Sequence, residues 1–390
     1  MKTKKIIAVF IIIAMLVLPL SGCYDSNEIE NLAYAIAVGI DKGQQKEFKL
    51  TFQIAVPTKI SGGGEESLTL KSFETDNILS GLKSVSESIS RQINLSHAKL
   101  IVFSEDIAKE GLSGIINGLV NTVEIRPTAN IIISTGSAYG YLDATDTNLS
   151  LSPSKYYELL FKSYEREFYT PSIQLNDFVY KLRNSGTQPI AMLCENNAVK
   201  RDSANSKQGA VSGIKGLAVF KGDKLVAELD HTNMSIFSLL TKTNENVYMT
   251  ISDPQDSKYN VLSIVRTQPE TSYKIKIEDG IPKISILLYL KGKIVGAQGK
   301  YNYLDEAHAV LLENAYREDI SDKLKAFLAI IAYQDKTDIV GFGAYAKRNF
   351  LTQKQWESFD WNNAFAKAQF HVEVKFRIDK SGNMLNETVE

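Results

Sequence analysis

Apolar residues in the first part of the chain follow two spacings, which predict strands and helices in alternation. Short apolar runs at 68–73, 99–103 and 130–134 are typical of strands. Between them, residues 76–93 and 104–121 place apolar side chains three or four positions apart, which indicates amphipathic helices. This strand–helix–strand–helix–strand order predicts an α/β layer with right-handed crossovers.

The pattern changes character after residue 213. Residues 217–220 and 225–229 flank a Lys-Gly-Asp-Lys turn, and residues 273–277 and 284–290 flank an Asp-Gly turn. Each pair of apolar runs around such a turn predicts a β-hairpin. The second half of the chain is therefore expected to begin with meandering strands.

A long helix and a final strand are predicted near the C-terminus. Ile320, Leu324, Phe327 and Ile331 recur at intervals of four, three and four, which forms one apolar helical stripe. From residue 370 to residue 378 apolar and polar side chains alternate, the pattern of a sheet strand with one face toward water.

Together these patterns predict an α+β fold with several domains: an N-terminal α/β domain followed by mixed-sheet domains with a long C-terminal helix. The expected division is a signal peptide at 1–22, an N-terminal α/β domain at 23–199, a linker at 200–213, a small strand-rich middle domain at 214–268 and a C-terminal α+β domain at 269–390. The linker is placed where Ser, Asn and Gly are frequent, because such residues disfavour regular structure.

The N-terminus has the pattern of a lipoprotein signal. Lysines at positions 2, 4 and 5 precede an apolar run from Ile6 to Leu18, which is shorter than the roughly 20 residues that a spanning helix needs. Leu20-Ser-Gly-Cys23 then matches a lipobox, in which the chain is cut after Gly22 and Cys23 is acylated. We therefore expect an exported protein that is anchored to the outer face of a membrane through Cys23.

Charge and cysteine content exclude several classes of protein. The formal net charge is −1, with 44 basic and 45 acidic residues, so the chain lacks the basic excess that nucleic-acid binding requires. Once Cys23 is acylated only Cys194 remains, so no intrachain disulfide can form. Cys194 lies in an apolar run and is expected to be a buried, unreactive side chain.

No constellation of residues indicates catalysis, a metal site or a cofactor. The four histidines, His97, His231, His308 and His371, do not have metal-ligand spacing, and the phosphate-loop, dinucleotide and nucleophile-elbow motifs are absent. Trp356 lies near Trp361 in an aromatic cluster, for which core packing and an exposed partner surface are both open interpretations. The sequence thus predicts a protein that is not an enzyme.

Five stretches together resemble the Ger(x)C, or GerAC-type, spore germination lipoproteins. They are Cys23–Ile29, Leu32–Asp41, Ser96–Asp106, Arg166–Pro171 and Gln334–Gly343, in the order of that family. Two positions depart from its pattern: Tyr24 stands where the family most often has Trp, and Asp335 replaces a common Lys.

The resemblance implies a non-catalytic lipoprotein subunit of a nutrient germinant receptor in the spore inner membrane. Its implied partners are two integral membrane subunits, A-type and B-type, and the implied fold has three α/β-type domains. Within the last stretch, Gln334, Asp338, Gly341 and Gly343 form either a structural turn or a contact with a partner subunit. The identity of the germinant does not follow from the sequence.

Two other classes of protein stay open. A solute-binding lipoprotein of an ABC importer would share the lipid anchor, but it would repeat βα units in both halves, whereas the pattern shows them only in the first. An envelope enzyme would need a catalytic constellation, and none was found. Neighbouring genes for two multi-pass proteins would favour the receptor, and genes for an ATPase and a permease the importer.

Overall fold

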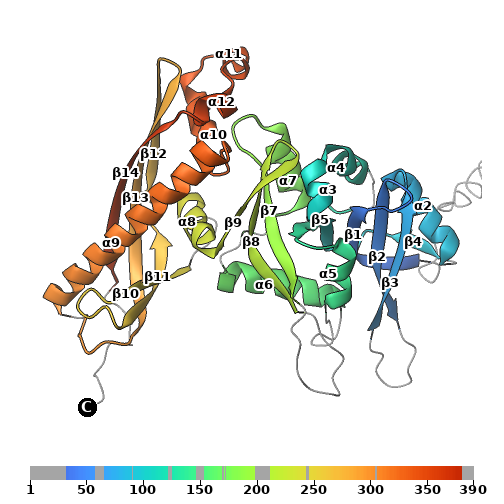
Figure 1. Ribbon diagram of the computed structural model, residues 1–390, viewed down its shortest axis with the longest axis horizontal. Helices are drawn as coiled ribbons and strands as arrows, with labels where there is room; N and C mark the ends of the chain where they lie inside the picture. Colours follow the sequence, from blue (N-terminus) through green and yellow to red (C-terminus); the bar gives the residue numbers. More distant parts are fainter. Residues whose placement is uncertain are drawn as a thin grey trace, which may run out of the picture.

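The computed structural model describes most of the chain and shows two sheets joined by helices (Figure 1). The described residues are 32–57, 66–89, 91–121, 125–145, 153–168, 171, 173–197, 211–242, 246–303 and 305–379. Within them, one sheet has nine strands and the other has five. The predicted signal peptide, 1–22, and Cys23 lie outside the described residues.

The first sheet is mixed, with parallel strands at its centre. Its order is β3-β2-β1-β5-β6-β7-β8-β9, and β4 pairs with β1. β1, β5, β6 and β7 run parallel to one another, whereas the pairs β1–β2, β2–β3, β7–β8 and β8–β9 are antiparallel. The bounds are β1 Leu32–Lys42, β2 Phe48–Pro57, β3 Glu66–Thr75, β4 Gln92–Asn94, β5 Leu100–Ser104, β6 Asn130–Ser134, β7 Ile190–Asn197, β8 Val211–Lys221 and β9 Lys224–Leu229.

Helices cover both faces of this sheet, which explains why its central strands are apolar throughout. In β5, Leu100 and Val102 pack with α5 and α6, while Ile101 and Phe103 belong to the core that includes α2, α3, α4 and α7. The helix bounds are α2 Ile78–Ser88, α3 Glu105–Glu110, α4 Ser113–Val120, α5 Ala138–Ala144, α6 Pro153–Phe168 and α7 Leu175–Arg183.

The single helix predicted at 104–121 is two helices, α3 and α4. Gly111 separates them with a φ of 128°, in the left-handed region that favours glycine. The turn between β8 and β9 docks at this break, where the Leu112 N–H donates to the Asp223 carbonyl (3.0 Å) and the Ser113 N–H to the Asp223 carboxylate (3.0 Å). A tertiary contact therefore replaces the missing helical turn.

The second sheet has the order β10-β11-β13-β12, with β14 parallel beside β13. Its bounds are β10 Val247–Ser252, β11 Asn260–Thr267, β12 Ser272–Glu278, β13 Ile281–Ala297 and β14 Gln369–Ile378. Helix α9, Glu306–Ala329, lies along this sheet (Figure 1) and buries Ile320, Leu324 and Phe327, as the stripe predicted. The Tyr316 ring stacks on Phe376 with a centroid distance of 4.8 Å.

Short helices follow α9 and form the end of the molecule above the second sheet (Figure 1). They are the π-helix η3 Ile330–Gln334, α10 Phe342–Ala346, the 3-10 helix η4 Lys347–Asn349, α11 Gln353–Ser358 and α12 Trp361–Phe365. The observed mixture of helices, two sheets and a long C-terminal helix confirms the predicted α+β class.

Helix α8, His231–Thr241, was not predicted and lies between the two sheets (Figure 1). It contacts β8, β10 and α9, and Met234, Ile236, Phe237 and Leu240 are all buried. A helix that is enclosed on several sides needs no polar face, so its sequence has no helical stripe.

The predicted linker at 200–213 does not separate two sheets. β7 and β8, which lie on either side of residues 198–210, are antiparallel neighbours in the first sheet. The predicted middle region, 214–268, is shared: β8 and β9 belong to the first sheet, and β10 and β11 belong to the second. The change from one sheet to the other falls at α8.

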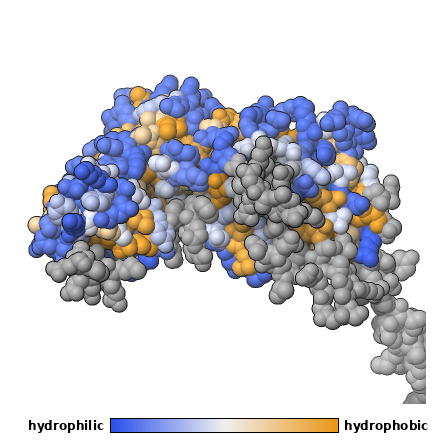
Figure 2. All heavy atoms as spheres, turned by 60° about the horizontal axis from the view of Figure 1, so that its bottom comes forward, coloured by the Kyte–Doolittle hydropathy of each residue, from blue (hydrophilic) through white to orange (hydrophobic). Residues whose placement is uncertain are grey.

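The surface mixes hydrophilic and hydrophobic side chains. Figure 2 shows a face on which apolar patches are interrupted by hydrophilic residues. Among the described residues, no helix combines the length and apolar character needed to cross a membrane.

Candidate functional site

The family-like stretch Gln334–Gly343 meets the first sheet's unit at one compact contact region. Residues 184–188, between α7 and β7, form one side of it, and residues 338–343 and 356–362 form the other. We call this region the joint.

Asp338 is the centre of the joint. Its side chain is 1% exposed, and its carboxylate accepts hydrogen bonds from the N–H groups of Gly341 (2.8 Å), Phe342 (3.1 Å) and Gly343 (2.7 Å). The indole N–H of Trp361 donates a fourth, at 2.9 Å. A buried carboxylate needs such donors, since without them its desolvation would be very costly.

The local sequence explains why these donors point at one carboxylate. Helix α9 ends in the π-helix η3, and the chain then reverses through Lys336, which has a φ of 55°. Gly341 has a φ of 88° and precedes α10, so the first N–H groups of that short helix face back toward Asp338. Asp338 therefore fills the place of a capping side chain.

Burial shifts the acidity of this carboxyl. Desolvation raises the pKa of Asp338 to about 6, and the N–H donors from Gly343, Gly341, Trp361 and Phe342 oppose the rise. The folded joint thus holds a proton more tightly than an exposed aspartate would.

Hydrogen bonds across the joint connect it to the first sheet's unit. The Gln188 N–H donates to the Asp338 carbonyl (2.8 Å), and the Gln188 side-chain amide donates to Asn362 (3.0 Å). The indole N–H of Trp356 donates to Ser185 Oγ at 2.7 Å. Gln188 also accepts from the Gly222 N–H (2.7 Å), which ties the β8–β9 turn to the same place.

Gly343 allows two backbone segments to approach closely. A Cβ at this position would lie 2.5 Å from the Gly186 carbonyl oxygen, 2.6 Å from Gly186 Cα and 2.6 Å from Trp361 Nε1. Only glycine therefore fits without moving the backbone of the opposite segment.

The structure brings together three of the four predicted motif residues. Asp338, Gly341 and Gly343 meet in the joint, whereas Gln334 lies exposed at the end of η3. Neither the periodicity nor the spacing of the sequence predicts that the two tryptophans lie beside this motif. Trp356 and Trp361 are nevertheless both 2% exposed, and both donate hydrogen bonds within the joint. Core packing is therefore the observed role of these two rings.

A second aspartate from a family-like stretch, Asp41, is used in a similar way. It is the last residue but one of β1, and its carboxylate accepts from the N–H groups of Ala138 (2.6 Å) and Tyr139 (2.9 Å) at the start of α5. Burial raises its pKa, and these two donors oppose the rise. Asp41 therefore accepts hydrogen bonds from backbone N–H groups at the start of α5, as Asp338 does at the start of α10.

The environment of Cys194 disfavours a reactive thiol. Cys194 is fully buried beside Tyr141 and Tyr164, and burial raises the pKa of its thiol to about 12, which disfavours the reactive thiolate. Within the described residues, no group of three His, Cys, Asp or Glu side chains is arranged to hold a metal ion.

Two family models match the chain in sequence order. One, described as the spore germination protein N-terminal domain, covers residues 25–195, and the other, described as spore germination B3/GerAC like, C-terminal, covers residues 215–382. The boundary between the two family models falls between β7 and β8, although these strands are neighbours in one sheet.

Curated relatives and a solved structure match along nearly all of their length. Spore germination protein KC of Bacillus subtilis (strain 168) is 24% identical over 394 residues, which is 96% of this chain and 95% of that protein. Spore germination protein GerQC of Bacillus cereus is 24% identical over 371 residues, 93% of this chain and 96% of that protein. The crystal structure of the GerBC protein matches with a TM-score of 0.55 and 17% identity, covering 87% of this chain and 96% of that one, which shows a shared fold. With both family models matched in order and the same fold present, the chain belongs to the GerAC-type family of spore germination proteins.

Proposed function

We propose that this protein is a non-enzymatic, lipid-anchored subunit of a spore nutrient germinant receptor and is required for nutrient-triggered germination. The observation that carries the proposal is its similarity, over nearly its whole length, to proteins named for spore germination. Its partners would be two integral membrane subunits, A-type and B-type, in the spore inner membrane.

The lipobox supports the anchor, and the joint supports a role without catalysis. Cys23 follows a short apolar run and the residues Leu-Ser-Gly, so acylation would hold the folded units at the outer membrane face. Asp41 and Asp338, the buried acids of the family-like stretches, are each occupied by backbone N–H donors. Such carboxylates stabilise turns and are not free to act as general bases.

Deletion of the gene in its spore-forming host tests the function. Spores that lack the protein should stop responding to at least one nutrient in a panel of amino acids, sugars and nucleosides, followed as loss of optical density after nutrient addition. A plasmid copy should restore the response, and a copy with Cys23→Ala should restore it poorly. Deletion spores that respond normally to every nutrient tested would refute the proposal.

The anchor is tested separately by metabolic labelling. Wild-type protein should incorporate a labelled fatty acid and sediment with membranes, whereas the Cys23→Ala variant should do neither or accumulate as an uncleaved precursor. Label on the variant would show that the lipid is attached elsewhere.

A further inference from the structure

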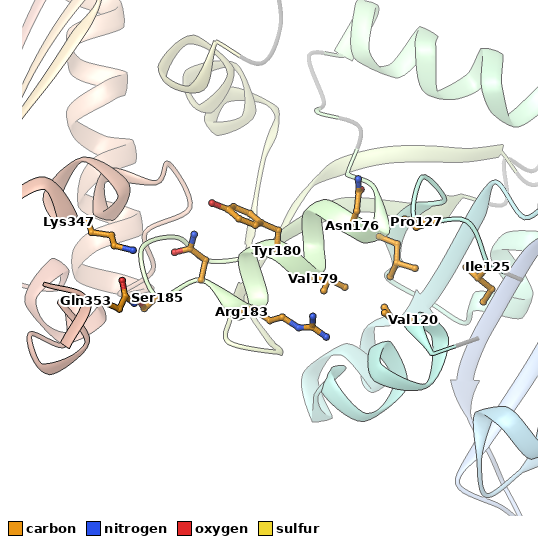
Figure 3. Close-up of a pocket in the computed structure, with 12 residues that line it drawn as sticks. Val120, Ile125, Pro127, Asn176, Val179, Tyr180, Arg183, Ser185, Lys347 and Gln353 are labelled. Carbon is orange, nitrogen blue, oxygen red and sulfur yellow. The ribbon is translucent and has the colours of Figure 1, made fainter. Parts of the chain in front are cut away.

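A pocket of about 540 Å³ opens beside the joint, between helices α4 and α7 and the C-terminal short helices. Figure 3 shows residues of both units around it: Tyr180 and Arg183 come from α7, whereas Lys347 and Gln353 come from the C-terminal segment. This volume lies in the range of about 300–1,000 Å³ that small-molecule sites occupy, and such sites favour domain interfaces.

The two ends of the pocket differ in polarity. In Figure 3, Val120, Ile125, Pro127 and Val179 gather toward one end, with Asn176 as the polar residue there. The other end carries Lys347, Gln353 and Ser185, and Arg183 and Tyr180 lie between the two groups (Figure 3). Asn184, which precedes Ser185 in the chain, also lines the pocket. A molecule with one apolar part and one polar part would match this division.

Among the described residues, the charge of the lining has one sign. Arg183 and Lys347 are its charged side chains, and none of the described residues that line the pocket is acidic. Neither cation forms an ion pair with any other described residue. An anionic group beside Arg183 would therefore meet a cation that no described carboxylate occupies, and Lys347 lies toward the other end of the pocket (Figure 3).

The polar end is fixed by hydrogen bonds that belong to the joint. Ser185 Oγ accepts from the Trp356 indole N–H (2.7 Å), and Asn184 Oδ1 accepts from the Gly186 N–H (2.9 Å). Tyr180 is 66% exposed at the opening, so a bound molecule would cover an aromatic face that water now contacts. A preformed wall lowers the ordering cost of binding.

We propose that this pocket binds a small organic anion whose apolar body packs between α4 and α7 and whose carboxylate, or similar group, pairs with Arg183, while Lys347 adds a weaker attraction from the other end of the pocket. Three chain segments line this partly open pocket, and its volume suits a small molecule. This ligand site goes beyond the role as a receptor subunit and is tested without reference to germination.

The test uses the full chain, lipid-anchored in nanodiscs, with empty nanodiscs as the blank. The probes are phenylacetate, phenylpropionate and phenylbutyrate, each compared with its uncharged amide by saturation-transfer NMR and by calorimetry. At least one acid should saturate at millimolar or lower concentration and bind at least about fivefold more tightly than its amide, since the cations act only on the charged form.

Matched variants locate the binding. Arg183→Gln should reduce the preference for the acid at least about threefold, and Lys347→Gln should reduce it less. Lys354→Gln, an exposed lysine on α11 outside this pocket, should leave it unchanged. Equal binding of acids and amides, unchanged affinity in Arg183→Gln, or no saturation by any acid would overturn the proposal. The last result would leave this surface available for a protein contact.

Discussion

The joint makes a sharp prediction at Gly343. In Gly343→Ala, the new Cβ must displace the Gly186 backbone and the Trp361 ring, because it would lie 2.5–2.6 Å from atoms of both. Overpacking of this kind costs about 1–3 kcal/mol. Moving Trp361 also weakens its hydrogen bond to the Asp338 carboxylate, and bonds to charged groups are worth about 1.5–3 kcal/mol. We expect the free energy of unfolding to fall by about 3 kcal/mol or more.

Tryptophan fluorescence provides an assay that is specific to the joint. The chain has two tryptophans, Trp356 and Trp361, and both lie there. Denaturation followed by their emission should shift strongly in Gly343→Ala, with an altered emission maximum already in the native state. Gly114→Ala in α4 is the matched control: nothing lies within 4 Å of its added Cβ, so stability should stay equal or rise by up to about 1 kcal/mol.

The reasoning is refuted if Gly343→Ala unfolds within about 0.5 kcal/mol of wild type and keeps the native emission spectrum, because a change of that size is ordinary for a surface substitution. That result would mean that the segments 184–188 and 338–343 do not pack as closely as the contacts require.

Three further predictions concern other parts of the chain. Phe327→Ala on the buried face of α9 should lower the free energy of unfolding by about 3–5 kcal/mol in urea melts, whereas Lys325→Ala on the exposed face should change it little. Burial raises the pKa of Asp338 to about 6 from 3.8, so the folded state binds this proton more tightly than the unfolded state does. The group's stabilising contribution is therefore complete below about pH 4 and is lost as the pH rises through about 6. Asp338→Asn should remove this pH dependence from the free energy of unfolding. In protein whose Cys23 is acylated, Cys194→Ser should remove all reactivity toward thiol reagents, and wild type should react only after unfolding, in a labelling time course.

The sequence predicts the elements whose periodicity is set by one buried face. The stripe on α9 and the alternation in β14 follow directly from packing against a sheet, and both were read correctly from spacing alone. Helix α8 is not predicted from the sequence because it is enclosed between two sheets and has no polar face. The helix break at Gly111 is not predicted either, because Asp223, which docks there, lies more than a hundred residues away in the chain.

The sequence predicts the turn in the candidate site but not the segment that the turn contacts. The glycines in residues 338–343 indicate a turn, and the apolar residues on either side of Asp338 indicate that the chain enters the core there. Its partners at 184–188 form a short polar loop with no periodicity, so no local pattern connects it to the C-terminal half. The two glycines that meet there, Gly186 and Gly343, are ordinary loop glycines when each is read alone.

The joint also determines how firmly the two sheet units are held together. Three hydrogen bonds cross it, from Gln188 to Asp338 and Asn362 and from Trp356 to Ser185. At about 1 kcal/mol each, their loss on opening costs roughly 3 kcal/mol, and exposing the Trp356 ring adds to that cost. An open arrangement would therefore occupy less than about one molecule in a hundred at equilibrium. A partner that separates the two units must bind the open form more tightly by at least this free energy, so in the free protein both units should move as one body.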